Sequence, residues 1–255
     1  MDPTLFVFIP AYQAARTIES VLERIPADAW DMAVRVVVIN DGSRDDTAAV
    51  VERCRARYPK LDLFSFEQNR GYGDAVRKGL ELARASGADY TACLHSDGQY
   101  PPEKLAEFTR HMARNGVDVL QGSRHKEGTA LQGNMPYYKW AAGLALTWIE
   151  NRAFGLSLTD YHSGYMFYSR RALEQIPFDG LSRYFDFDVE VIASARTRGL
   201  KIDELAIPTR YADEDSHLNP IRYGFHVLWV VVKYKLGAYN PPSGRDGGSV
   251  ATRGA

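Results

Sequence analysis

Several features that would assign a protein to a class at once are scarce in this sequence of 255 residues. It has only two cysteines, Cys54 and Cys93, and they show neither CxxC nor metal-binding spacing. We therefore expect two buried thiols in a reducing compartment and no structural zinc. Lys and Arg number 31 against 32 Asp and Glu, so a net charge of -1 gives no global field that would draw the chain to nucleic acid.

Long hydrophobic runs are also missing. The longest candidate, from Phe225 to Val232, is much shorter than the ~20 apolar residues that a membrane-spanning helix requires. The first residues, Met1-Asp2-Pro3-Thr4, lead straight into an apolar run and lack the charged region and cleavage site of a secretory signal. We expect a cytoplasmic chain that, if it meets a membrane, lies on the membrane surface.

The sequence does contain a regular alternation of short apolar runs and amphipathic segments. Runs rich in β-branched and aromatic residues predict five strands. They are LFVFI (5–9), VRVVVI (34–39), LDLFSF (61–66), DYTACL (89–94) and VDVLQG (117–122). Apolar residues at three- and four-residue spacing predict helices between them, over 17–25, 45–57, 71–86 and 102–115. This alternation predicts a parallel α/β sheet with its binding loops at the carboxyl ends of the strands.

The alternation weakens after residue 122. A polar loop is expected over 123–134, and the elements that we expect after it are helix 137–154, strand 164–169, helix 188–197, strand 200–207 and helix 221–236. Residues 240–255 are rich in Gly, Pro, Ser and Arg, which predicts a disordered tail. We therefore expect a single domain over residues 1–239.

Polar residues follow the predicted strands. Asp41 lies beside Gly42 after the second strand, where its carboxylate is placed to accept hydrogen bonds from a base or a ribose, although Asn-Asp-Gly-Ser is also an ordinary turn sequence. The third strand leads to Asn69-Arg70-Gly71-Tyr72-Gly73, a helix start whose N–H groups suit phosphate, although most helix starts hold no ligand. After the fourth strand, Asp97 and Gln99 offer the oxygen ligands that Mg²⁺ or Mn²⁺ takes when it bridges two phosphates.

These motifs, in this order, resemble the inverting family 2 glycosyltransferases of GT-A fold. The likeness is carried by IPAYQ, INDGSRDDT, NRGYG, HSDGQYPP and QGSR and covers residues 5–236. Within the family it points to the branch of dolichyl-phosphate mannosyltransferase and related polyprenyl-phosphate hexose transferases. The resemblance implies a Rossmann-like mixed sheet, with a nucleotide-sugar half up to about residue 122 and an acceptor half from 123 to 239. It also implies hexose transfer from GDP-mannose or a UDP-hexose to a polyprenyl phosphate, assisted by Mg²⁺ or Mn²⁺.

The resemblance implies roles for individual residues. The metal ligands would be Asp97, Gln99 and His95, and Asp97 would also serve catalysis. Asp160, in the segment DYHSGY, would be the base or the acceptor-side carboxylate, although Asp is also common in loops and helix caps. The donor-binding residues implied by the same likeness are Pro10, Ala11, Tyr12, Asp41, Gly71, Ser96, Asp97, Arg124, Arg210 and His217.

Two departures from the family pattern limit this transfer of roles. Such enzymes commonly carry Asn-Glu after the tyrosine, where this chain has Gln13-Ala14. They also carry Asp-x-Asp where this chain has His95-Ser96-Asp97. Because histidine removes one formal negative charge, we expect weaker or altered metal dependence. The alternative is a histidine that only satisfies local hydrogen bonds.

Two of the predicted helices bear on a membrane contact. In helix 221–236 an apolar stripe runs through Ile221, Phe225, Leu228, Trp229, Val232 and Leu236. Helix 137–154 carries a similar face, with Tyr137, Trp140, Ala141, Leu144 and Trp148. Such stripes suit either packing on the sheet or the headgroup boundary of a membrane. The acidic residues Asp188 and Glu190 either shape the acceptor side or cap a helix.

Other functions stay open at this point. Sugar transfer to a soluble or glycan acceptor uses the same donor motifs. A nucleotide-sugar binding protein that has lost turnover would account for the changes at His95 and Gln13, but it has little use for Asp160. A nucleotidyltransferase would carry a glycine-rich, basic loop after the first strand, which IPAYQAA is not.

Overall fold

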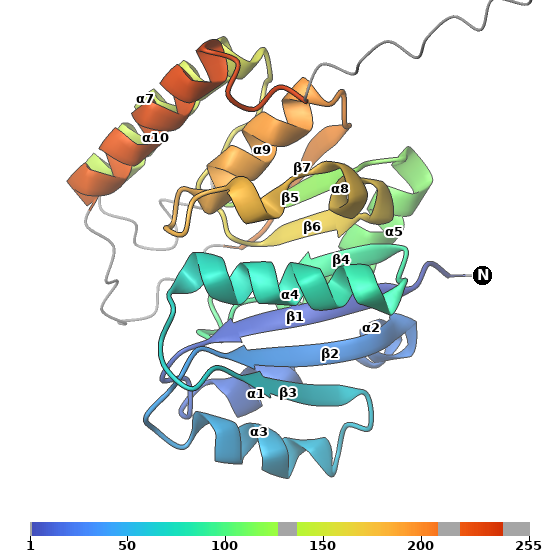
Figure 1. The fold of residues 1–255 in the computed structure, drawn as a ribbon. Coiled ribbons are helices and arrows are strands. Elements are labelled where there is room, and N and C mark those ends of the chain that lie inside the picture. Colours follow the sequence, from blue (N-terminus) through green and yellow to red (C-terminus); the bar gives the residue numbers. More distant parts are fainter. Residues whose placement is uncertain (1, 127–136, 209–219, 242–255) are drawn as a thin grey trace, which may run out of the picture.

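The computed structural model describes residues 2–126, 137–208 and 220–241, with the side chains of 137–141, 220 and 221 left aside (Figure 1). Its strands form one seven-stranded sheet in the order β3-β2-β1-β4-β6-β5-β7. They are β1 (Leu5–Ala11), β2 (Ala33–Asn40), β3 (Leu61–Ser65), β4 (Tyr90–Cys93), β5 (Val119–Ser123), β6 (Met166–Ser169) and β7 (Ile202–Ala206). Every strand predicted from the sequence is present.

Helices connect these strands. The predicted ones are α1 (Ile18–Glu23), α3 (Thr47–Arg55), α4 (Tyr72–Ser86), α5 (Leu105–Asn115), α7 (Tyr137–Phe154), α9 (Phe187–Thr197) and α10 (Pro220–Lys235). The sequence pattern missed two six-residue helices and a single 3-10 turn, because such short segments show no full amphipathic period. These are α2 (Ala27–Met32), α8 (Arg170–Gln175) and Phe178–Gly180.

One strand corrects the expectation of a parallel sheet. β1, β2, β3 and β4 pair in parallel, but β6 lies antiparallel between β4 and β5. The segment before β6 stays at the carboxyl edge, where Gly122 donates its N–H to the carbonyl of Tyr165 at 2.9 Å. Since β6 starts at the edge where β5 ends, it runs back in the opposite direction. The sheet is therefore mixed, as the family resemblance implies.

The two faces of the sheet are buried under different helices. Along β1, Phe6 and Phe8 point into the core cluster that contains α4, α8 and α9, while Leu5, Val7 and Ile9 point into the cluster with α1, α2, α3 and α5. This follows from the two-residue period of a strand. Both cysteines are buried free thiols, as predicted. The carboxyl ends of the parallel strands thus lie at one edge of a three-layer fold (Figure 1).

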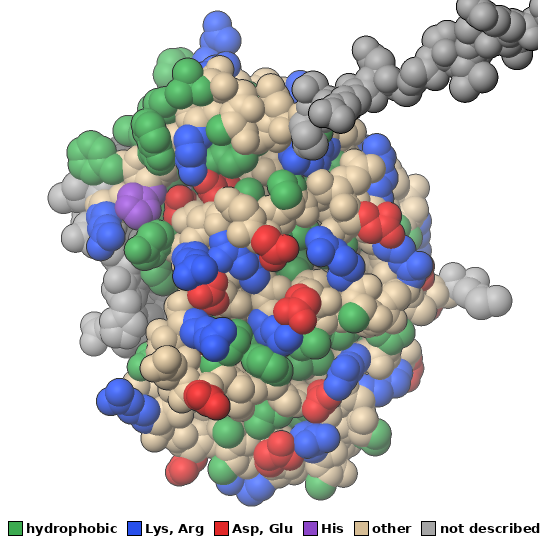
Figure 2. Space-filling model, in the orientation of Figure 1, with side chains coloured by type: hydrophobic (Ala, Val, Ile, Leu, Met, Phe, Trp, Pro, Cys, Tyr) green, Lys and Arg blue, Asp and Glu red, His purple; other side chains and the backbone are tan. Residues whose placement is uncertain are grey.

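The α7 and α10 helices lie side by side outside this fold (Figure 1). α10 packs inward through the fully buried Val227 and Val230, while its apolar stripe turns outward. Trp148 on α7 is 70% exposed and Leu236 is 77% exposed. Among the described side chains of the pair, the other large apolar ones that are exposed are Leu144, Phe225, Leu228, Trp229 and Val232. The stripe predicted on α10 therefore does not pack on the sheet, and Figure 2 shows hydrophobic side chains gathered over α10 at the upper left.

None of the helices in the described ranges is long and apolar enough to cross a membrane.

Candidate functional site

Asp41, directly after β2, binds the loop that precedes α4. Its Oδ1 accepts the N–H of Arg70 at 2.7 Å and its Oδ2 accepts the N–H of Gly71 at 2.8 Å. The N–H of Asp41 in turn donates to the carbonyl of Ala11 at 2.8 Å. The structure thus brings Ala11, Asp41 and Gly71, three residues predicted to hold the nucleoside, into contact at the ends of two adjacent strands.

Gly42 allows the close approach of these loops. Its φ is +65°, and a Cβ placed on it would lie 2.3 Å from the carbonyl carbon of Gln68. Any other residue would therefore both strain the backbone and clash with the neighbouring loop. Asp41 keeps its two main-chain partners only because glycine follows it.

The end of β1 is fixed by the segment after Asp41. The N–H of Gln13 donates to Ser43 Oγ at 2.9 Å, and that of Ala14 donates to Thr47 Oγ1 at 2.8 Å. Gln13 adopts a left-handed φ of 51°, and its side-chain amide donates to the hydroxyl of Tyr12 at 3.2 Å. Tyr12 stays exposed beside the partly buried Pro10. With Gln13-Ala14 in place of the family's Asn-Glu, Tyr12 is thus oriented by a contact with the side chain of Gln13.

Asp97 and Gln99 lie in one tight loop after β4. The N–H of Gln99 donates to Asp97 Oδ1 at 2.9 Å, and within the described residues Asp97 Oδ2 accepts no hydrogen bond. Arg24 braces the loop, because its Nη1 donates to the carbonyl of Gly98 at 3.1 Å. Ser96, the residue before Asp97, is buried. This pair of oxygen-bearing side chains fits a hard divalent cation that also takes oxygens from a diphosphate.

His95 is enclosed by aromatic rings and by Gly164. Its Nε2 lies 3.4 Å from the hydroxyl of Tyr72, and its ring packs edge-on against Tyr100 with centroids 4.9 Å apart. A Cβ on Gly164 would lie 2.6 Å from His95 Nε2. Burial lowers the pKa of His95 below its usual value, against the opposing effect of Asp97. The imidazole is therefore neutral at pH 7, and a cation would have to meet its Nδ1 rather than the enclosed Nε2.

A divalent cation would depend on oxygens that the substrate brings. The described residues form no group of three or more His, Cys, Asp or Glu side chains that would hold a metal ion by themselves. Asp97 and Gln99 remain the best placed of the three predicted ligands, since His95 already packs against Tyr72 and Gly164.

Asp160 lies in the loop before β6 and is 1% exposed. Its Oδ2 is 3.4 Å from Nε of Arg124, and its Oδ1 accepts the N–H of His162 at 2.8 Å. Burial by itself would raise the pKa of Asp160, but Arg124, His162 and His125 outweigh it and hold that pKa below its usual value. The structure therefore brings together Arg124 and Asp160, which the sequence separates by 36 positions, and keeps the carboxylate ionised.

The second acidic cluster divides into two roles. Asp188 Oδ2 accepts a hydrogen bond from the hydroxyl of Tyr72 at 2.9 Å, and burial raises the pKa of Asp188 to about 7. It thus joins the ring system around His95. Glu190 instead binds Lys233 and accepts the hydroxyl of Tyr239 at 2.6 Å, which ties α9 to α10. Asp188 borders the site, whereas Glu190 stabilises the fold.

Two predicted donor contacts, Arg210 and His217, lie outside the described residues. Sequence reasoning in turn missed Tyr72 and Tyr100, which enclose His95, although both stand inside motifs that it used. It also missed Glu150, which lies mid-helix in α7 and is 0% exposed. Glu150 is distinguished by its burial, and the sequence does not reveal that burial because it arises from the fold.

The polar carboxyl edge on a mixed Rossmann-like sheet defines the class of nucleotide-sugar transferases with GT-A fold. Residues 6–177 match the family model of Glycosyl transferase family 2. The chain belongs to this family and is a glycosyltransferase.

Named relatives cover most of the chain. It is 25% identical to the UDP-N-acetylglucosamine--dolichyl-phosphate N-acetylglucosaminyltransferase of Methanococcus voltae over 92% of this chain and 98% of that protein. It is 23% identical to the polyprenol monophosphomannose synthase of Mycolicibacterium smegmatis over 79% of this chain and 75% of that protein.

Solved structures show the same fold. A mannosyltransferase from Pyrobaculum calidifontis, in complex with GDP-Man and Mn²⁺, matches 98% of this chain and 66% of its own with a TM-score of 0.63 and 20% identity. Glucosyl-3-phosphoglycerate synthase from Mycobacterium tuberculosis, in complex with Mn²⁺, UDP and phosphoglyceric acid, matches 95% of this chain and 81% of its own with a TM-score of 0.62 and 20% identity.

Proposed function

We propose that this glycosyltransferase moves a hexose, with inversion, from a nucleoside diphosphate sugar to a polyprenyl phosphate at a membrane surface. The observation that carries the proposal is the Arg124 and Asp160 pair, which lies at the same edge of the sheet as the donor loops. Named relatives that act on dolichyl and polyprenol phosphates support this choice of acceptor.

The donor half of the site would bind the nucleotide through its main-chain geometry. Asp41 has two oxygens that already accept N–H groups of the loop before α4, and each retains a lone pair for a base or ribose donor. Tyr12 offers an exposed ring, and it directly follows Ala11, whose carbonyl accepts the N–H of Asp41. The base of the nucleotide, guanine or uracil, would be chosen by the shape of this pocket.

Asp97 and Gln99 would hold Mg²⁺ or Mn²⁺ on the diphosphate of the donor. When bound, the ion supplies positive charge that stabilises the departing nucleoside diphosphate. The residues of the chain set its position, because Arg24 and the hydrogen bond between Gln99 and Asp97 fix the loop.

The acceptor half would bring the phosphate oxygen to the anomeric carbon of the sugar. A polyprenyl phosphate is already an anion near neutral pH, so it needs a cation to receive it more than a base to deprotonate it. Arg124 supplies that charge, and the ionised Asp160 keeps the guanidinium in place. The new bond forms from the phosphate oxygen to carbon as the bond to the nucleoside diphosphate breaks.

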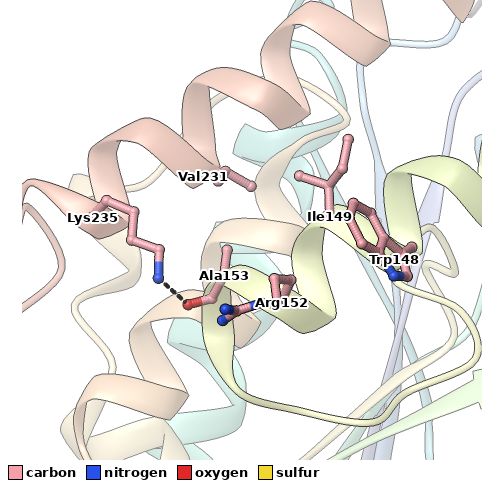
Figure 3. Close-up of a pocket in the computed structure, with 6 residues that line it drawn as sticks. All are labelled: Trp148, Ile149, Arg152, Ala153, Val231 and Lys235. Atoms are coloured by element: carbon pink, nitrogen blue, oxygen red, sulfur yellow. Dashed lines mark hydrogen bonds between the residues drawn. The ribbon is translucent and has the colours of Figure 1, made fainter.

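The α7 and α10 helices would seat the enzyme on the membrane. Their outward apolar side chains form an exposed patch, and a hollow of about 240 Å³ lies between them, lined by Trp148, Arg152, Val231 and Lys235 among others (Figure 3). Lys235 donates to the carbonyl of Ala153 at 2.8 Å at this point. Basic side chains around apolar ones suit the anionic headgroup boundary.

A transfer assay tests the reaction. Radiolabelled GDP-mannose, UDP-glucose and UDP-N-acetylglucosamine are each incubated with a short polyprenyl phosphate, a polyprenol and a soluble sugar, with and without Mn²⁺ or Mg²⁺. Label that enters the organic phase only with the phosphate supports the proposal. Transfer to the soluble sugar alone would establish the other acceptor class, and donor binding by thermal shift without transfer to any acceptor would indicate a binding protein.

Flotation with vesicles tests the membrane contact. We expect the protein to float with vesicles that contain anionic lipid and to remain in the pellet fraction when Trp148 and Trp229 are both replaced by serine. Both rings are largely exposed, so their replacement leaves the core intact. A wild-type protein that never floats would remove the membrane from the proposal.

A further inference from the structure

A buried carboxyl group without a hydrogen bond lies behind the acceptor half of the site. Glu150 on α7 is 0% exposed, and neither of its side-chain oxygens has a hydrogen-bond partner within the described residues. It contacts His162, whose Nε2 lies 3.4 Å from Glu150 Oε2 and has no hydrogen bond within the described residues. Burying such groups costs stability, so their presence calls for another explanation.

His162 is held at its ring by two helices. Glu150 approaches Nε2 from α7, and the hydroxyl of Tyr223 lies 3.0 Å from Nδ1 on the α10 side. The ring has no other hydrogen-bonding neighbour in the described part of the chain. Removing the polar group at Glu150 or at Tyr223 would therefore let the imidazole move.

The main chain of His162 in turn holds both members of the acceptor pair. Its N–H donates to Asp160 Oδ1 at 2.8 Å, and its carbonyl accepts from Arg124 Nη2 at 2.8 Å. A shift of the ring would thus be transmitted to the carboxylate and to the guanidinium. Displacements of about 1 Å at a reacting centre can cost about 100-fold in rate.

We propose that Glu150 and Tyr223 are positioning residues that act through His162 to hold Arg124 and Asp160 in the arrangement required for transfer. The proposal rests on the function proposed above, because that function places Arg124 and Asp160 at the reacting centre. It also assigns a second task to α7 and α10, the helices that carry the exposed apolar patch.

The hydrogen-bond direction along this chain follows from the protonation of its members. Burial raises the pKa of Glu150 well above its usual value and lowers that of His162 to about 4, with Asp160, Arg124 and His125 also acting on the ring. Burial raises the pKa of Tyr223 as well. Burial therefore favours the neutral form of each group. In its neutral form the Glu150 carboxyl faces Nε2 with an O–H across the 3.4 Å contact, which leaves the ring proton on Nδ1 to be donated to the Tyr223 oxygen.

Three variants and a control test this arrangement. Glu150→Gln keeps a donor for Nε2, Glu150→Leu removes it with little change of volume, and Tyr223→Phe removes the other partner. Asp118→Asn is the control, since Asp118 is also a buried carboxylate but directly precedes β5, outside these helices, where it accepts Ser169 Oγ at 2.9 Å and the Lys201 N–H at 2.9 Å. Stability, kcat and KM for both substrates, and the ¹⁵N spectrum of the histidine rings are measured for each.

We expect rescue by the conservative variant. Glu150→Gln retains kcat within about threefold, whereas Glu150→Leu and Tyr223→Phe lower kcat about 10-fold to 100-fold and leave KM for the donor unchanged. Glu150→Leu is at least as stable as wild type, because an apolar side chain replaces an unsatisfied carboxyl. The His162 signals report the Nδ1–H tautomer in wild type and Glu150→Gln, and they change in Glu150→Leu.

Two results would overturn the proposal. One is a folded Glu150→Leu with wild-type kcat, and the other is a His162 spectrum that is the same in wild type, Glu150→Leu and Tyr223→Phe. The spectrum needs no turnover, so it tests the positioning even if wild type transfers sugar to none of the acceptors, which would refute the proposed function instead. If Glu150→Leu does not fold, Tyr223→Phe decides by the same readouts.

Discussion

The donor half and the acceptor half of the site hold their carboxylates in different ways. Asp41 and Asp97 accept main-chain N–H groups from loops that the strands place side by side. Asp160 accepts one main-chain N–H, that of His162, but also pairs with the side chain of Arg124. Asp188 accepts from the side chain of Tyr72, and Glu150 has no hydrogen bond within the described ranges. In the acceptor half, burial and a few neighbouring side chains therefore decide whether each carboxyl is ionised.

This difference separates two tasks. Main-chain donors belong to the fold itself, so the donor half proposed above would bind a nucleotide without requiring any particular neighbouring side chain. Buried side-chain partners respond to a change in one residue, so the acceptor half is the part of the site where small shifts alter reactivity.

Asp97→Asn should cost the most. The change removes the formal charge of the best-placed metal ligand, so we expect turnover to fall about 1,000-fold, or about 4 kcal/mol, at saturating donor. The amide retains the size of the side chain and an oxygen for the Gln99 N–H, so the thermal midpoint should stay close to wild type. Asp62→Asn, at a strand pair away from the site, serves as the control. Wild-type turnover in Asp97→Asn would refute the metal assignment.

Asp41→Ala should mainly destabilise the donor half. Two hydrogen bonds to a charged acceptor are lost at once, and each contributes about 1.5–3 kcal/mol. We expect the free energy of unfolding, measured with urea, to fall by about 3 kcal/mol and donor affinity to fall with it. Asp41→Asn keeps one acceptor oxygen and should lose about half as much. An alanine variant with wild-type stability would show that the loops do not depend on this carboxylate.

The effect of Asp188→Asn on the free energy of unfolding should depend on pH. The folded pKa of Asp188 is about 7, above the unfolded value of about 3.9, so the folded state binds the proton more tightly. Its stabilising contribution is complete below pH 4 and is lost as the pH rises to 7. Asparagine does not titrate and still accepts from Tyr72. The stability of the variant relative to wild type should thus increase by on the order of 4 kcal/mol as the pH rises from 4 through 7 and then stay level. A difference that does not change with pH would contradict the buried, protonated carboxyl.

Arg152→Ala and Lys235→Ala should have the smallest effects. Each removes one positive charge beside the apolar patch, which is worth about 1 kcal/mol, or about fivefold, in binding to anionic vesicles. Lys60→Ala is a matched control, because Lys60 also donates to a main-chain carbonyl, that of Trp30, but lies at the start of β3. Equal losses for Lys60→Ala and Lys235→Ala would remove the patch from the binding surface.

The sequence predicted the donor half better than the acceptor half, for a physical reason. The strands up to residue 122 and the neighbourhood of Asp41 and Gly71 follow from local periodicity and from the rule that parallel strands gather their loops at one edge. The direction of β6 and the burial of Glu150 depend on contacts between segments that are far apart in the chain. The close fit of Gly164 against His95 is of the same kind.

The position of β6 also sets an order for folding. β4 pairs with β1 on one side, but its other neighbour, β6, follows only after α5, β5 and α7. At synthesis rates of about 5–20 residues per second, β4 waits roughly 4–15 s as an open sheet edge. An unpaired edge of this kind invites pairing with other chains. Nascent chains of this protein should therefore be most prone to aggregate between the completion of β4 and the arrival of β6, and a chaperone that covers that edge should improve the yield of folded protein.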